Sequence, residues 1–176
     1  LVEPVPSLVS LVSHDPDCKK MMGLALKNVT LTLFEDGKDI FEEQGEMLFT
    51  HFGISGPLTL SASSHLGDMK KHKYHAEIDL KPALDEGKLD ARILLDLDMY
   101  QNRTMENALT DLLPRSMIPV VLDRLDISYD LQANSFPKQK RRQLVELLKA
   151  FPIDITGKRP VSEAIITSGG VKVSEI

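Results

Sequence analysis

The period of the hydrophobic pattern changes twice along this chain, and the order of these changes constrains its fold more than any other feature. Residues 29–33 alternate between apolar and polar side chains, as do other stretches before residue 84, which indicates strands with one buried face. Between residues 84 and 152 the apolar residues recur instead at helical spacing, and alternation returns afterwards. We therefore expect an α+β fold. Residues 1–83 plus 153–176 would form a β-barrel-like antiparallel domain, interrupted by a small four-helix bundle over residues 84–152.

The first domain carries a clear hairpin signal. Asp36-Gly37 follows an alternating stretch, and a tight two-residue turn needs positive φ at both of its central positions. The return strand is expected from Lys38 to about Glu43. Gly45 then breaks the pattern, so Glu46–Thr50 is predicted as a separate strand, and Lys73–Leu80 alternates cleanly as another.

Four helices are predicted in the middle of the chain. They cover Leu89–Tyr100, Met105–Leu113 behind an N-cap at Thr104, a run from Met117 to Leu125, and Pro137–Ala150. Strands are expected again over Val161–Thr167 and Val171–Ile176, with Gly169 and Gly170 in the loop between them. We expect these final strands to rejoin the first sheet.

Composition and the two ends of the chain narrow the class of protein. The 176 residues carry a formal net charge of −5, which argues against a large nucleic-acid surface. No apolar run approaches the roughly 20 residues of a membrane helix, and no signal peptide is recognisable, so a cytoplasmic location is expected. Cys18 is the only cysteine, which excludes an internal disulfide and a cysteine-based zinc site. The chain opens on Leu1 and closes on an apolar alternating stretch, as expected for a piece of a longer polypeptide.

The segment Gly45–Ser61 is the densest candidate for a functional site. It joins a strand to a turn that holds Gly53 and Gly56, and then to a helix for which Ser55 is the expected N-cap. Pro57 fits the first turn of that helix, where a missing N–H does no harm. Backbone N–H groups at such a turn can bind an anion or a ligand carbonyl. The same segment would also serve as a tight turn and a capped helix without any ligand.

Other chemistries find less support in the sequence. A serine nucleophile elbow needs Gly-x-Ser-x-Gly, but Pro57 stands where the last glycine should follow Ser55. His72 and His75 would point to opposite faces of a strand, so they would chelate a metal poorly, and no metal site is expected. The basic run over residues 138–142 could contact nucleic acid or an acidic partner, but it lacks an aromatic platform and is better explained as a solvated helix face. The sequence contains neither G-x-G-x-x-G nor G-x-x-x-x-G-K-[ST].

Two segments resemble a known family. GEMLFTHFGISGPLTLSASS, at residues 45–64, resembles the GE-x-LFTH-x-G-x-SGP signature of the bacterial NAD(P)/FAD-dependent oxidoreductases, the bile-acid-dehydrogenase-like flavoproteins. EAIITSGGVKVSEI, at residues 163–176, resembles the A-x-x-T-x-GGV-x-x-x-EI segment of the same family. PSLVSLV near the start and IDLKPALD at residues 78–85 also match in character, so the resemblance covers nearly the whole chain.

The resemblance implies a particular place for this chain in a larger enzyme. In that family the FAD-binding Rossmann-type domain is split, and its two parts flank an insert made of a β-barrel-like part and a helical bundle. The resemblance therefore implies that this chain is the substrate-side insert of a FAD-dependent oxidoreductase with NAD(P)H as the electron donor. A flavin pyrophosphate needs the glycine loop and helix N-terminus of the Rossmann unit. We accordingly expect no FAD bound to this chain alone, and no activity.

Two loops are expected to face the flavin or the substrate in the intact protein. Their candidate cofactor-binding residues are Thr50, His51, Gly53, Ser55, Gly56, Thr167, Gly169 and Gly170. The expected roles are backbone and hydroxyl hydrogen bonds, and His51 is the one conventional acid–base candidate. Paired glycines also suit a plain turn between two strands, so composition does not decide the role of the second loop.

The expected partners are the FAD-binding domain of the same polypeptide and a small-molecule substrate, with neither nucleic acid nor a membrane. The alternative function is a non-catalytic protein- or nucleic-acid-binding module, in which the basic run at residues 138–142 would make the contacts.

Overall fold

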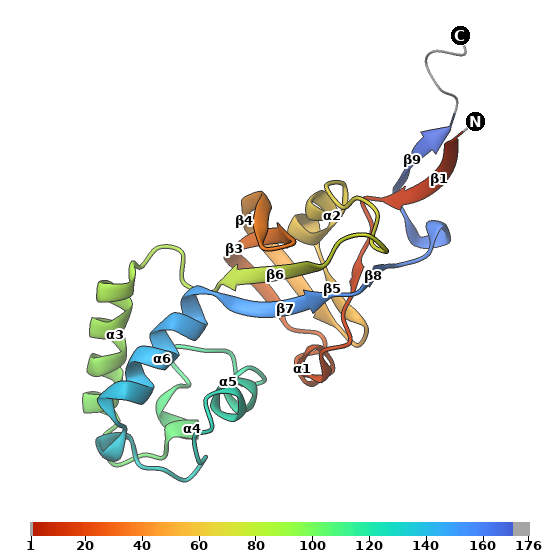
Figure 1. Cartoon of the computed structure of the whole chain (residues 1–176). Helices are drawn as coiled ribbons and strands as arrows, with labels where there is room; N and C mark the ends of the chain where they lie inside the picture. The colour runs from red at the N-terminus through yellow and green to blue at the C-terminus, as the bar shows by residue number, and fades with distance from the viewer. Residues whose placement is uncertain (1, 171–176) are drawn as a thin grey trace. The chain divides into compact units, whose positions relative to one another are not determined.

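The chain folds into two compact units with both helices and strands, which is the α+β class expected from the sequence (Figure 1). The structure is a computed structural model that describes the backbone of residues 2–170 and the side chains of residues 7–165. One unit consists of Leu1–Glu77 with Ile153–Ile176, and the other of Ile78–Pro152.

The first unit is built on a seven-stranded sheet in the order β7-β6-β3-β4-β5-β2-β8. These strands are β2 (Leu11–Val12), β3 (Ala25–Glu35), β4 (Lys38–Thr50), β5 (Gly53–Ser55), β6 (Tyr74–Asp79), β7 (Phe151–Ile155) and β8 (Gly157–Lys158). The pairings of β3 with β4, β4 with β5, β5 with β2 and β2 with β8 are antiparallel. The edge strands β7 and β8 follow one another in the chain with only Thr156 between them. No strand pairing in the described residues closes the sheet there, so it is an open sheet rather than a closed barrel.

The β3–β4 hairpin confirms one expectation and corrects another. Asp36 and Gly37 have φ angles of 49° and 83°, so both turn positions are left-handed as predicted. The expected break at Gly45 is wrong, because β4 runs unbroken from Lys38 to Thr50. A Cβ at Gly45 would lie 3.2 Å from Cδ2 of Leu58, a residue of helix α2 (Pro57–Ser63). This glycine therefore makes room for a helix that packs on the strand.

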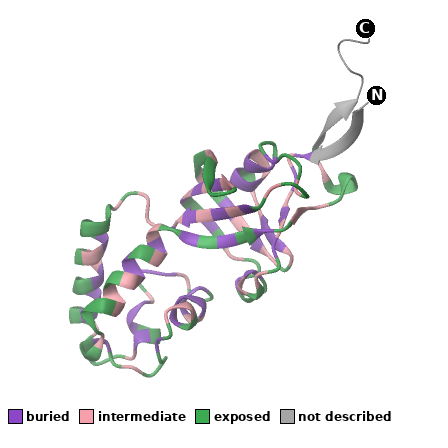
Figure 2. Ribbon diagram, in the orientation of Figure 1, coloured by how far each residue is buried: buried purple, intermediate pink, exposed green. Residues whose placement is uncertain are grey.

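The core of the first unit follows the alternation read from the sequence. Along β6 buried and partly exposed residues alternate without exception, and Figure 2 shows the pattern. Side chains with no exposed surface come from six strands of this sheet and include Leu11, Leu31, Phe49, Ile54, Ala76 and Ile153. Burial of these apolar side chains is the main force that stabilises this unit.

The end of the chain differs from its predicted form. Strand β1 (Val2–Ser7) pairs antiparallel with β9 (Ile166–Gly170) in a separate two-stranded sheet, and the two lie side by side in Figure 1. The expected strand over Val161–Thr167 is wrong in its first part, because Val161–Glu163 forms a 3₁₀ turn. The expected loop at Thr167–Gly170 is also wrong, since these residues pair with β1 instead of rejoining the seven-stranded sheet. The predicted strand Val171–Ile176 lies outside the described residues.

The helical unit contains a helix at each of the four predicted places. They are α3 (Glu86–Met99), α4 (Met105–Ala108), α5 (Ile118–Arg124) and α6 (Lys138–Lys149), with a 3₁₀ turn at Ala133–Ser135. Thr104 precedes α4 as expected, but α4 is a single turn and stops well before Leu113. The proline at position 114 disfavours a helical conformation at the residue before it. The expected small four-helix bundle is therefore wrong, because one of the four helices is a single turn.

Six α-helices occur in the described chain as a whole, because α1 (Pro16–Lys20) and α2 belong to the first unit. None of the helices within residues 2–170 combines the length and the apolar character needed to cross a bilayer.

Helices α3 and α6 supply the main packing contact of the helical unit. Buried residues recur along both helices at helical spacing, and they are Leu89, Ile93 and Leu97 on α3 and Leu144, Val145 and Leu148 on α6. The carboxylate of Asp85 caps α3 by accepting a hydrogen bond of 2.7 Å from the backbone N–H of Lys88. The two helices thus bury one apolar face each and leave their charged faces to solvent.

Candidate functional site

The turn between β4 and β5 brings together the first group of predicted site residues. Thr50 ends β4, and its Oγ1 accepts a hydrogen bond of 3.1 Å from the backbone N–H of Gly53. His51 and Phe52 form the turn, with their rings edge to face and 5.1 Å apart between centroids. The carbonyl of Phe52 accepts a 2.8 Å hydrogen bond from the backbone N–H of Ser13. The turn is therefore fastened to the neighbouring strand, and the side chain of His51 is exposed.

Gly53 and Gly56 are needed because other backbone segments pass very close to them. A Cβ at Gly53 would lie 2.2 Å from the carbonyl oxygen of Leu11 on β2. At Gly56, where φ is 91°, a Cβ would lie 2.9 Å from Cα of Met47 on β4. The space beside each glycine is thus filled by the protein's own backbone, and packing accounts for both positions.

Ser55 does not cap helix α2, which corrects the prediction. Gly56 occupies the N-cap position, while Pro57 stands in the first turn as expected. Ser55 stays extended in β5 because it pairs with Leu48 of β4. Its Oγ lies 2.6 Å from Oγ of Ser10, so the hydroxyl bonds across to the segment that enters β2.

This turn does not offer the features of a flavin pyrophosphate site. The N–H of Gly53 is already bonded to Thr50, and helix α2 has only seven residues. No hydrogen-bond partner orients the ring of His51 within the described side chains. The residues present therefore do not fit FAD phosphates, and we derive no chemical step at this turn.

The two predicted loops are connected through the segment that links β1 to β2. Thr167 lies opposite Pro6 and Gly170 opposite Val2 in the small sheet, where the side chains are outside the described range. Further along, the N–H of Ile165 donates to the carbonyl of Leu8 at 3.3 Å. Within the described backbone, no hydrogen bond or strand pairing is seen between Thr50–Gly56 and Thr167–Gly170.

Arg159, which the sequence did not reveal as a candidate site residue, lies beside the turn between β4 and β5. The Arg159 guanidinium stacks over the ring of Phe52 at 4.4 Å and forms two hydrogen bonds of 2.7 and 2.8 Å to the Glu163 carboxylate. This pairing lowers the pKa of Glu163. Glu163 follows Arg159 by four residues, and this spacing could have suggested the ion pair. The contact of Arg159 with Phe52 depends on the fold and could not be read from the spacing.

His72 and His75 have different partners. Nδ1 of His72 lies 2.6 Å from Oδ2 of Asp36 and 3.4 Å from Oε1 of Glu35, whereas His75 stacks on Phe34 at 4.7 Å. The hydrogen bond to Asp36 raises the pKa of His72, and the backbone N–H of Lys73 together with His72 lowers the pKa of Asp36. The direct His72–Asp36 bond makes this cluster an ion pair that fastens the segment before β6 to the β3–β4 hairpin.

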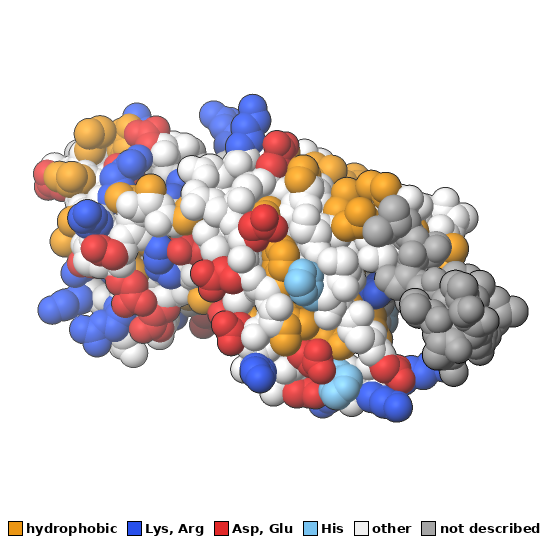
Figure 3. Space-filling view, turned by 90° about the horizontal axis from the view of Figure 1, so that it is seen from above, with side chains coloured by type: hydrophobic (Ala, Val, Ile, Leu, Met, Phe, Trp, Pro, Cys, Tyr) orange, Lys and Arg blue, Asp and Glu red, His pale blue; other side chains and the backbone are white. Residues whose placement is uncertain are grey.

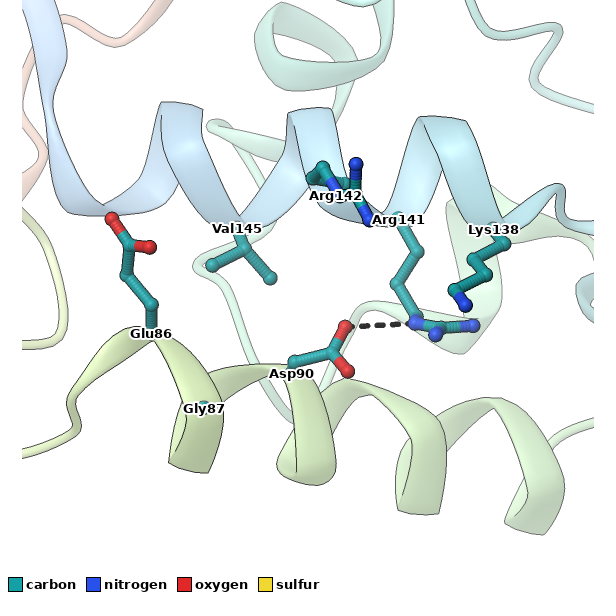
Figure 4. A pocket seen from close by; sticks show the side chains of 7 residues that line it. All are labelled: Glu86, Gly87, Asp90, Lys138, Arg141, Arg142 and Val145. Atoms are coloured by element: carbon teal, nitrogen blue, oxygen red, sulfur yellow. Dashed lines mark hydrogen bonds and ion pairs between the residues drawn. The ribbon is translucent and has the colours of Figure 1, made fainter.

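The predicted basic run lies on α6 and lines a hollow of about 240 Å³ against α3. Arg141 donates from Nε to Oδ1 of Asp90 at 2.8 Å, as Figure 4 shows, and Glu86 also lines the hollow. Lys140 donates to the carbonyl of Leu125 at 2.6 Å. Figure 3 shows acidic and basic side chains mixed over the face that it displays, without a patch of one sign. Of the four cations in this run, Arg141 is thus paired with a carboxylate and Lys140 is bonded to a backbone carbonyl.

Known proteins are similar to this chain across nearly its whole length. Residues 5–166 match the family model described as HI0933-like protein barrel and H2TH domain. The 3-dehydro-bile acid delta(4,6)-reductase of Clostridium scindens is 24% identical over 175 residues, which are 98% of this chain and 42% of that protein. The ribosomal RNA dihydrouridine synthase of Escherichia coli is 25% identical over 171 residues, or 96% of this chain and 40% of that protein.

A second ribosomal RNA dihydrouridine synthase, from Haemophilus influenzae, is 25% identical over 178 residues, covering 100% of this chain and 41% of that protein. The chain thus spans about two fifths of the length of these curated relatives.

Proposed function

The chain belongs to the HI0933-like family, because residues 5–166 match its barrel and H2TH domain, and from this premise we propose that it is the substrate-side part of a FAD-dependent oxidoreductase. That match is the observation on which the proposal depends, since it extends over both compact units. The flavoprotein signatures at residues 45–64 and 163–176 support the same assignment. In this proposal the helical unit is an insert in the barrel-like part.

We propose that FAD is held by another part of the same polypeptide, and that this chain alone is inactive. The turn at Thr50–Gly56 does not fit a pyrophosphate, and the relatives are more than twice as long as the region they share with this chain. FAD, when bound, supplies hydride chemistry, while the protein provides binding and orientation. The proposed role of the segments Thr50–Gly56 and Thr167–Gly170 is to face the flavin or the substrate.

The names of the relatives support a reduction as the reaction of the whole protein. One is a delta(4,6)-reductase and the other two are synthases of dihydrouridine, a nucleoside with two more hydrogens than uridine. We infer that the intact protein reduces an unsaturated bond of its substrate, with NAD(P)H as the electron donor. The sequence favours a small-molecule substrate and no nucleic acid, and the two relatives that act on ribosomal RNA make RNA the second class to test.

The competing proposal, a non-catalytic binding module, has less support. It depends on the basic run of α6, where Arg141 is paired with Asp90 and Lys140 is bonded to a carbonyl. Glu86 and Asp90 also place two carboxylates in the same hollow. A polyanion that approaches α6 would meet both signs of charge.

Flavin retention tests the proposal directly. The chain alone and a longer polypeptide that includes its natural flanking segments are each incubated with FAD and desalted, and the flavin absorbance of each protein is measured. We expect stoichiometric flavin and NADH or NADPH oxidation only in the longer polypeptide. Stoichiometric flavin on the chain alone would place the cofactor site within it and contradict the proposal.

The role of His51 is tested in the longer polypeptide. If His51 transfers a proton, His51→Ala lowers kcat and removes one limb of its pH profile. If the residue only lies beside the substrate, the variant changes KM and leaves the shape of the kcat profile intact. His14→Ala, another exposed histidine of the same unit, is the matched control.

A further inference from the structure

A second polar hollow in the helical unit has a different character from the one beside α6. It measures about 350 Å³ and is lined by Arg103, Asn107, Thr110 and Arg115. These residues come from the segment before α4, from α4 itself, and from the turns between α4 and α5. No carboxylate lines it, whereas Glu86 and Asp90 both line the α6 hollow. Two arginines therefore line one hollow that has no carboxylate among its lining residues.

Arg103 is held in place without using its hydrogen-bond donors. Its guanidinium stacks over the ring of Tyr100 at 4.2 Å, and a cation–π contact leaves the N–H groups at the edge of the plane available. Its backbone is fixed as well, because its N–H donates to the carbonyl of Tyr100 at 2.9 Å and its own carbonyl accepts from Ala133 at 2.9 Å. Tyr100 in turn donates its hydroxyl to the carboxylate of Asp111. The arginine is thus oriented before any ligand arrives.

Arg115 and Asn107 add further donors. Arg115 is exposed, and within the described residues its guanidinium has no ion pair. Asn107 donates one of its two side-chain N–H groups to Thr104 at 3.1 Å and keeps the other. Guanidinium groups match phosphate with paired N–H donors, and this match is the reason that arginine is so common in phosphate recognition.

Two carboxylates belong to the surroundings of the hollow, although neither is among its lining residues. Glu106 lines an adjoining hollow with Asn107, Thr110 and Arg115, and Asp111 is engaged by Tyr100. Both reduce the positive potential that a ligand meets. The site is also open to solvent, so its affinity should be modest and should fall with ionic strength.

We propose that Arg103 and Arg115 form a phosphate-binding groove that holds a phosphate group of a ligand or substrate. The groove goes beyond the proposed oxidoreductase function, because it needs neither the flavin nor the turn at Thr50–Gly56. Two sources share this chemistry: a phosphodiester of single-stranded RNA and a free phosphate group. The groove would anchor either one on the helical unit.

Two titrations distinguish the sources. The chain is titrated into a labelled, unstructured single-stranded RNA and followed by fluorescence anisotropy, and inorganic phosphate alone is titrated into the chain and followed by NMR shifts. For two phosphate contacts on a single strand, log K should fall with log salt with a slope of about −1.4, which is about sevenfold between about 50 and 200 mM. Arg115→Ala should weaken binding evenly across RNA sequences and reduce that slope by about 0.7.

Matched variants separate the groove from general charge. The double variant Arg103→Ala/Arg115→Ala removes two positive charges from the groove, and Lys138→Ala/Arg142→Ala removes two from α6. Glu106→Gln should tighten binding, because it removes a repelling carboxylate that lines the adjoining hollow. Loss of the Arg103–Tyr100 stack could disturb folding, and thermal unfolding of each variant checks this point. In that case the single variant Arg115→Ala takes the place of the double variant in the comparison.

The two titrations, made with the wild type and the variants, either support the phosphate-binding groove or overturn it. RNA binding that the groove variant weakens and the α6 variant does not supports the groove with a phosphodiester as its ligand. Shifts with inorganic phosphate that depend on Arg115, without RNA binding, support it with a free phosphate. Absence of both signals at low salt, or equal losses in the two double variants, would overturn the proposal. None of these measurements involves flavin, so their failure leaves the proposed function to its own test.

Discussion

The ammonium group of Lys149, at the end of α6, lies 2.7 Å from Oδ2 of Asp79. Asp79 is close to the first residue of the helical unit. The same group donates to the carbonyls of Lys81 and Leu84, which lie in the segment leading to α3. The backbone N–H of Leu80 donates to the carbonyl of Leu148 at 2.9 Å and strengthens this connection. One side chain thus ties the last turn of α6 to the start of the helical unit.

Loss of this ammonium group should destabilise the helical unit. Lys149→Met keeps much of the aliphatic stem but leaves two carbonyls and a partly buried carboxylate without their donor. Hydrogen bonds to charged groups make this worth about 1–3 kcal/mol in the free energy of unfolding. Urea denaturation measures it, with Lys88→Met on the exposed face of α3 as the control, expected within about 0.5 kcal/mol of wild type. Equal effects of the two substitutions would contradict the assigned role.

Gly53 should tolerate no side chain. In Gly53→Ala the new Cβ would meet the Leu11 carbonyl oxygen at 2.2 Å, and a backbone atom cannot move aside as a flexible side chain can. We expect a loss of about 3 kcal/mol or more, the range of severe overpacking. Gly37→Ala is the matched control, because its φ of +83° is unfavourable for alanine but nothing lies within 4 Å, and it should lose only about 1–2 kcal/mol. Thermal unfolding compares them, and a milder effect at position 53 than at 37 would contradict the close approach.

The Ser10–Ser55 hydroxyl pair predicts a coupling that an N-cap would not show. Each single alanine variant should lose about 0.5–1.5 kcal/mol of stability, the usual net value of a hydrogen bond. Because the two hydroxyls bond to one another, the double variant should lose less than the sum of the single losses. A double-mutant cycle by urea denaturation measures the coupling. Strict additivity would indicate that Ser55 acts alone, as a helix cap would.

Local patterns predicted those parts of the fold that local physics determines. The alternation of β6 confirms the predicted strand, the Asp36-Gly37 turn has both positive φ angles, and helices begin near each predicted start in the middle of the chain. In these elements each residue's role depends on neighbours within a few positions, so the spacing of apolar and polar residues is sufficient to predict the element.

The errors occur where contact with another element decides the structure. Gly45 reads as a strand breaker, but it leaves room for Leu58 of α2. Ser55 reads as a cap, but pairing with Leu48 keeps it extended. The glycines after Ile166 read as a loop, but β1 at the opposite end of the chain pairs with them. None of these contacts follows from the period of a single segment, and the same holds for the contact of Arg159 with Phe52.

The His72–Asp36 ion pair predicts a window of pH in which it stabilises the fold. The pKa of His72 is raised above its ordinary value of 6.5, chiefly by Asp36, so the stability from this group is fully present below that value and is lost as pH rises through the folded pKa. The pKa of Asp36 is lowered below 3.8, chiefly by the N–H of Lys73 and then by His72, so its contribution is present above 3.8 and is lost as pH falls through the folded pKa. The pair therefore contributes most between about pH 4 and 6.5.

Removal of the carboxylate should abolish this window. In Asp36→Asn the imidazole of His72 keeps only Glu35 and the more distant Asp68 as nearby negative charges, so its titration midpoint should fall toward the ordinary value. NMR of the imidazole protons measures that midpoint, and thermal unfolding from pH 4 to 8 measures the stability. Asp39→Asn changes the same charge on the return strand of the hairpin and serves as the control. A His72 midpoint that is unchanged in Asp36→Asn would show that the two side chains are not bonded in solution, because the largest cause of the raised pKa would then be absent.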